Sequence, residues 1–133
     1  MVYSLKKIEL LTKALRGDKK ILTRLMKESP EYAALGAALV GSTAAMQWLL
    51  KNHKLFAAFV DSVHDNKTAL QTLLKERHFE LAAVSNMLNE DEEAELWLEK
   101  HNLKLYIDFA VAIQHAMDKE VENDLGGYFT LYG

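Results

Sequence analysis

This chain of 133 residues contains no cysteine, one proline and six glycines. Without cysteine it can form neither a disulfide nor a thiolate zinc site. No apolar run approaches the roughly 20 residues that a membrane-spanning helix needs. The first residues also lack the apolar segment and cleavage site of a signal peptide. We therefore expect a single domain over residues 1–133 that is cytoplasmic and has no membrane partner.

The net charge is only −3, so no strong field of one sign favours nucleic acid. Single-stranded nucleic acid is usually bound by basic residues together with stacking aromatics, and residues 1–27 contain Tyr3 as their one aromatic residue. We expect no nucleic-acid partner. The charge is nevertheless uneven, because residues 1–40 hold eight Lys or Arg and four Asp or Glu, whereas residues 90–133 hold three and eleven. This asymmetry leaves self-association through oppositely charged ends, and hence a homo-oligomer, open as an alternative function.

A unit of about 24 residues recurs four times, a period that signals stacked repeats. The copies cover residues 17–40, 41–64, 65–89 and 90–115. The first half of a unit carries apolar residues at the spacing of one helix face, as at Leu49 and Leu50. The second half carries paired alanines, such as Ala57 and Ala58, which let two helices approach closely. Each unit is therefore predicted to be a short helical hairpin.

These patterns predict an all-α fold, a right-handed α-solenoid of four helical hairpins over residues 17–115. A capping helix over residues 3–16 precedes the hairpins, and residues 116–133 form a C-terminal cap and tail. With about 10 Å per layer, the array would be a rod of about 40–50 Å. Glycines at the unit starts, Gly17 and Gly41, are predicted to have positive φ.

The layout over residues 17–115 resembles the α-helical-hairpin solenoids as a class, such as tetratricopeptide, armadillo and HEAT arrays. The period is shorter than the roughly 34 residues of a tetratricopeptide. The resemblance implies a stack of helices with an extended face for a partner, and it implies no catalytic residue.

No catalytic or nucleotide-binding motif occurs in the sequence. Asp61 with His64, and His115 with Asp118, have a spacing that could place metal ligands on one helix face. A histidine beside an acid on a solvated helix is common, and a helix-end histidine also suits the helix dipole. We therefore expect no catalytic residue, no metal and no cofactor. A small-molecule or metal-dependent activity inside the helical array is the least favoured alternative.

The leading expectation is a protein-interaction scaffold that binds a protein or peptide on one face of the solenoid. Trp97 shares the predicted register of Leu25, Leu49 and Leu73, which places it in the core, whereas Trp48 lies one position off that register. Lys51 and Lys75 recur at one position of successive units, where they either bind an acidic partner or offset the helix dipole. The candidate binding residues are Trp48, Lys51, Lys75, Tyr128 and Phe129.

Overall fold

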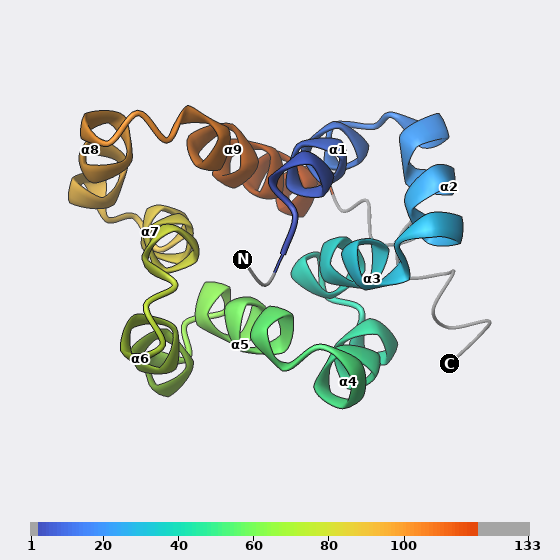
Figure 1. Ribbon diagram of the computed structural model, residues 1–133, viewed down its shortest axis with the longest axis horizontal. Helices are drawn as coiled ribbons and strands as arrows, with labels where there is room; N and C mark the ends of the chain where they lie inside the picture. The colour runs from blue at the N-terminus through green and yellow to red at the C-terminus, as the bar shows by residue number, and fades with distance from the viewer. Residues whose placement is uncertain (1–2, 120–133) are drawn as a thin grey trace.

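Residues 3–119 are described in the computed structural model, and they form nine α-helices and no strand (Figure 1). The helices are α1 (Leu5–Leu15), α2 (Lys19–Glu28), α3 (Pro30–Leu39), α4 (Thr43–Asn52), α5 (Lys54–Val63), α6 (Lys67–Lys75), α7 (Phe79–Leu88), α8 (Glu92–Lys100) and α9 (Lys104–Lys119). The all-α prediction is confirmed for these residues. Two helices arise from each repeat unit, as the apolar pattern indicates.

Every unit starts with the same turn, which ends one helix and begins the next. Its first residue has φ between 69° and 108°, and the four residues are Gly17, Gly41, Asp65 and Glu90. The positive φ predicted for the two glycines is confirmed. The following residue is the N-cap of the next helix; for example, the Asn66 side chain accepts a 3.0 Å hydrogen bond from the Ala69 N–H. Such caps satisfy N–H groups that a helix cannot satisfy itself.

The turn inside a unit occurs in two lengths. Ser29 and His53 alone separate the two helices of the first and second units. In the third and fourth units three residues separate the helices, and the middle one is left-handed, Arg77 with φ of 67° and Asn102 with φ of 56°. The outer helix of these units is also one residue shorter, nine residues instead of ten, so the net insertion is one residue. The added residue lengthens the repeat spacing from 24 to 25 residues in this part of the chain.

This longer turn overturns the predicted register of Trp97. The position equivalent to Leu73 in the last unit is Leu98, which is 0% exposed, as Leu73 and Leu49 are. Trp97 directly precedes Leu98, just as Trp48 directly precedes Leu49 in the second unit. It is half-buried and packs against the core. The prediction was wrong because a single residue inserted in a turn rotates every later side chain by about 100° around its helix.

The helices form a closed ring rather than a rod (Figure 1). Five inner helices, α1, α3, α5, α7 and α9, each contact the next, and α1 also contacts α9. Each outer helix, α2, α4, α6 or α8, packs on the two inner helices that flank it in the sequence. The predicted rod would keep the first and last helices about 40 Å apart. The structure differs because the inner helices share one central core, so the rotation between units brings the last helix back to the first.

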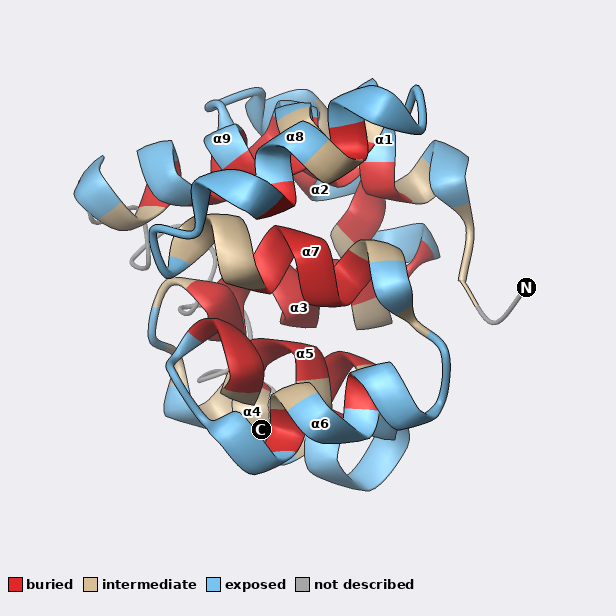
Figure 2. Ribbon diagram, turned by 90° about the vertical axis from the view of Figure 1, so that its left-hand side faces the viewer, coloured by how far each residue is buried: buried red, intermediate tan, exposed pale blue. Residues whose placement is uncertain are grey.

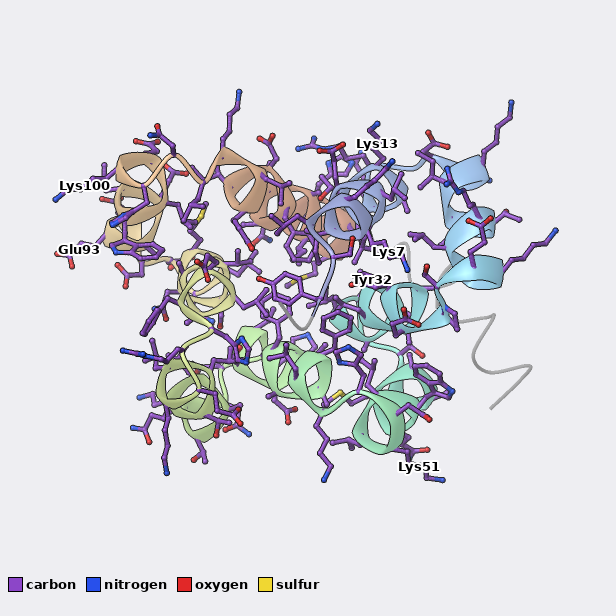
Figure 3. All side chains as sticks on the ribbon, viewed as in Figure 1. Lys7, Lys13, Tyr32, Lys51, Glu93 and Lys100 are labelled. Atoms are coloured by element: carbon purple, nitrogen blue, oxygen red, sulfur yellow. The ribbon has the colours of Figure 1, made fainter. Side chains whose placement is uncertain are left out.

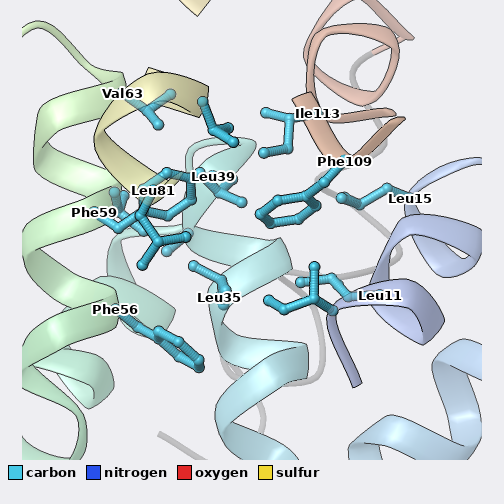
Figure 4. Close-up of a cluster of buried hydrophobic side chains, with 14 of the residues drawn as sticks. Leu11, Leu15, Leu35, Leu39, Phe56, Phe59, Val63, Leu81, Phe109 and Ile113 are labelled. Carbon is cyan, nitrogen blue, oxygen red and sulfur yellow. The ribbon is translucent and has the colours of Figure 1, made fainter. Parts of the chain in front are cut away.

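An equivalent position in each inner helix contributes one fully buried side chain to the central core (Figure 4). Those five side chains are each 0% exposed, and they are Leu11, Leu35, Phe59, Val84 and Phe109. The rings of Phe59 and Phe109 stack with centroids 6.0 Å apart, although 50 residues separate them in sequence. The inner helices are accordingly the most buried elements, while the outer helices expose much of their surface (Figure 2).

Aromatic side chains tie the N-terminal ends of the inner helices together. The hydroxyl oxygens of Tyr3 and Tyr106 are 2.8 Å apart, and the Tyr32 hydroxyl accepts a 2.7 Å hydrogen bond from the Ser4 N–H. The Tyr32 ring meets Phe56 edge-on at 5.1 Å. Burial raises the pKa of Tyr3 and of Tyr106 above the ordinary tyrosine value. These contacts hold the first residues of the chain against α9 and α3, and so help to close the ring.

Candidate functional site

A groove of about 360 Å³ lies between the second and third hairpins. Its lining comes from three consecutive helices and one cap: Leu50 of α4; Lys54, Ala57, Ala58 and Asp61 of α5; and Asn66, Thr68, Ala69 and Thr72 of α6 and its N-cap. We call this surface the α5–α6 groove. Its volume falls within the range of small ligand pockets, about 300–1,000 Å³.

Small side chains create the depth of the α5–α6 groove. Ala57 and Ala69 are 2% and 9% exposed, so methyl groups from both facing helices form the buried part of the lining. Leu50 stands at the edge with 52% of its surface exposed. An apolar floor beside an exposed leucine favours contact with another apolar side chain, because the contact would remove both surfaces from water.

Two opposite charges also line the α5–α6 groove. Lys54 and Asp61 both belong to α5, seven residues apart. Within residues 3–119, neither side chain lies within 4 Å of an opposite charge, whereas Arg24 and Glu28 pair at 2.8 Å. The α5 wall therefore offers one cationic and one anionic group with solvent as their partner.

The open lining of the α5–α6 groove coincides with a change in the repeat. Thr72 occupies the same position in its unit as Trp48 and Trp97 occupy in theirs, because 24 residues separate it from Trp48 and 25 from Trp97, the repeat spacings in this part of the chain. Both tryptophans are half-buried and pack against the core from their outer helices. The same position in the first unit is Arg24, whose guanidinium pairs with Glu28 on the surface. The third unit thus has a small side chain where its two neighbours have an indole.

Three of the candidate residues taken from the sequence, Trp48, Lys51 and Lys75, are described, and none of them lines this groove. Lys51 and Lys75 are exposed at the ends of α4 and α6, and Lys51 points away from the ring (Figure 3). Trp48 is half-buried against the core instead of standing free. Tyr128 and Phe129 lie outside the described residues. The break in the tryptophan series at Thr72 was the sequence signal that could have located the groove.

A second and larger depression, of about 550 Å³, lies along the contact between α1 and α9. Its lining is mostly charged and consists of Glu9, Thr12, Lys13, Arg16, Lys104, Leu105 and Asp108. In the described ring, α1–α9 is the one inner pair that no outer helix covers (Figure 1). Positions that are buried alanines in α3, such as Ala33 and Ala37, are therefore exposed Glu9 and Lys13 in α1. We call this surface the α1–α9 seam. Its charged lining is the polar outer face that the first and last helices of a repeat array need, because no further unit of the described ring covers them.

Across residues 3–119 no three His, Asp or Glu side chains lie close enough to hold a metal ion. His64, one of the histidines with suitable spacing, has its Nε2 atom 3.1 Å from the Leu39 carbonyl oxygen. In the same part of the chain, every helix is too short or too polar to cross a membrane.

No protein-family model matches this chain, and searches of curated proteins and of solved structures also give no match. Its function must therefore be inferred from its own residues and their arrangement.

Proposed function

We propose that this protein is an interaction module that binds a protein or peptide segment in the α5–α6 groove. The observation that carries the proposal is the apolar, alanine-lined groove with the exposed Leu50 at its edge. Leu74 and Phe79, each 43% exposed, are further exposed apolar side chains at the end of α6 and the start of α7, outside the groove lining. Apolar side chains that are exposed to water in the free protein contribute most to the free energy of binding when a partner covers them.

We further propose that the four units are a closed form of the α-helical-hairpin solenoid, wound in the right-handed sense. Equivalent turns, caps and buried positions in each unit support this assignment. Lys51 and Lys75 would then belong to the outer surface beside the groove, where they would attract acidic side chains of the partner.

The alternative, self-association through oppositely charged ends, has less support. The basic helix α1 contacts α9, and α9 contacts the acidic helix α8. The two charged regions are thus near neighbours in one molecule and are not the opposite ends of a rod. Size-exclusion chromatography would detect this alternative as a larger apparent molecular mass at low salt than at high salt, because salt screens the attraction between opposite charges.

A peptide-display selection tests the proposed function. The native protein is used to select binders from a random peptide library, and each binder is then measured on two variants, Leu50→Lys and Leu96→Lys. Both substitutions replace an exposed leucine, but only Leu50 lines the groove. Since burying a leucine contributes about 1.5–3 kcal/mol, we expect Leu50→Lys to weaken binding by about tenfold or more.

Leu96→Lys is the matched control and should change the affinity by less than twofold. Binders that tolerate both substitutions equally well, or that respond only at Leu96, would contradict a binding site in the α5–α6 groove.

A further inference from the structure

The repeat itself indicates which side chain the α5–α6 groove fits. In the second and fourth units, the residue directly before the buried leucine of the outer helix is a tryptophan, Trp48 before Leu49 and Trp97 before Leu98. The third unit has Thr72 before Leu73, and Thr72 lines the groove. The groove thus lies beside the outer-helix position at which the second and fourth units carry an indole packed against the core.

We infer that the α5–α6 groove is a socket for an aromatic side chain, tryptophan above all, that a partner protein inserts beside Thr72. This inference rests on the proposed function and specifies the class of partner. Aromatic side chains bury about 150–250 Å² each and often dominate the energetics of interfaces. The methyl groups of Ala57, Ala58 and Ala69 give such a ring an apolar surface to lie on.

The charges of the α5 wall define the residues that flank this aromatic anchor. Lys54 and Asp61 are seven residues apart on one helix, a separation of about 10 Å along its axis. A complementary partner carries a carboxylate beside Lys54 and a cation beside Asp61, with the aromatic residue between them. In a helical partner those two charges are also about seven residues apart. Opposite charges arranged in this way set the direction in which the partner lies across the groove.

The test uses two synthetic helical peptides of equal composition. In the first, a single tryptophan has a glutamate four residues before it and a lysine three residues after it; in the second, the two charged residues are exchanged. Titration calorimetry with the native protein should show that one peptide binds at least fivefold more tightly than the other. The double variant Lys54→Glu/Asp61→Lys should reverse this preference.

A variant that fills the groove from within tests the socket directly. Thr72→Trp supplies the indole that the third unit lacks, so it should reduce the affinity for the preferred peptide at least tenfold. Arg24→Trp is the matched control, because it places a tryptophan at the same position of the first unit, away from the groove. It should leave the affinity within twofold. Equal binding by the native protein and Thr72→Trp would overturn the inference.

A second measurement covers the case in which Thr72→Trp does not fold. N-acetyltryptophanamide is titrated into the native protein while the alanine methyl signals are followed by NMR. We expect the largest shifts at Ala57, Ala58 and Ala69, and shifts confined to other alanines would refute the socket.

The outcome for the socket is separate from that for the proposed function. If the display selection yields groove binders that respond to Leu50→Lys but need no aromatic residue, the interaction module stands and the aromatic socket falls. If a peptide with leucine in place of tryptophan binds equally well, the groove is apolar without being selective for aromatic rings, which also overturns the inference.

Discussion

Leu73 and Leu74 are adjacent residues of α6, but the ring places them in opposite environments. Leu73 is 0% exposed and belongs to the hydrophobic core, whereas Leu74 is 43% exposed. Substituting each in turn with alanine therefore compares a core position with a surface position in the same helix. The helix propensity changes equally in both variants, so it does not affect the difference between them.

The expected magnitudes follow from these two environments. Leucine to alanine removes three carbon atoms, and their transfer from water to an apolar interior contributes about 0.8 kcal/mol each. At Leu73 the cavity left between α6 and its neighbours adds to this loss, so the free energy of unfolding should fall by about 3–5 kcal/mol. At Leu74 only part of the side chain leaves water on folding and no closed cavity forms, so the loss should be about 1 kcal/mol or less.

The assay is urea denaturation of the two variants and the native protein, followed by far-ultraviolet circular dichroism. A common slope for all three curves would show that the same surface is exposed on unfolding, which makes the midpoints comparable. Losses that are equal within 0.5 kcal/mol, or a larger loss at Leu74, would refute the reasoning. Either result would mean that α6 presents a different face to the inner helices.

Three further predictions concern ring closure, a histidine and the unit turns. The chain has no cysteine, so spin labels attached to the double variant Lys13→Cys/Lys104→Cys report a single distance. Both residues line the α1–α9 seam. Pulsed electron paramagnetic resonance should therefore give a distance well below the about 40 Å of an open rod. His53 caps α5, because its Nδ1 atom accepts a hydrogen bond from the Phe56 N–H, and burial lowers the pKa of His53. The unfolded state therefore binds a proton more readily than the folded state, so the free energy of unfolding should fall as the pH drops from 7.5 to 5. The fall should be smaller in His53→Asn, which keeps a capping side chain but does not titrate. Glu90 has φ of 69°, so Glu90→Gly should raise the melting temperature by relieving about 1 kcal/mol of backbone strain. Gly41 has φ of 108°, so Gly41→Ala should lower the melting temperature. Changes of the opposite sign would contradict the turn geometry.

Much of the local structure could be predicted from the sequence because it depends on residues close together in the chain. The helix-forming period and the glycines with positive φ both act within one or two turns. The equivalence of Leu25, Leu49 and Leu73 was also visible, and all three are buried. Trp97 was misplaced because a one-residue difference between turns is small in a repeat pattern but large in angle around a helix.

The candidate site was less accessible to sequence reasoning. Lys51 and Lys75 stood out because they recur, but recurrence on an exposed helix end reflects the helix dipole as readily as a binding role. The groove residues did not stand out, since alanine and threonine have no chemistry of their own at that spacing. Their importance arises from the bulky side chain that the third unit lacks, which becomes meaningful only beside Trp48 and Trp97 in aligned units.

The sequence by itself determined that this protein consists of short helices in repeated pairs, because periodicity, caps and turns are set by near neighbours. Only the tertiary structure decided that the pairs close into a ring, with Phe109 of α9 stacked on Phe59 and packed in one core with Leu11 of α1. Closure depends on a small rotation between successive units that accumulates along the chain. No single residue encodes that rotation; it follows from how all the inner side chains fill a common core.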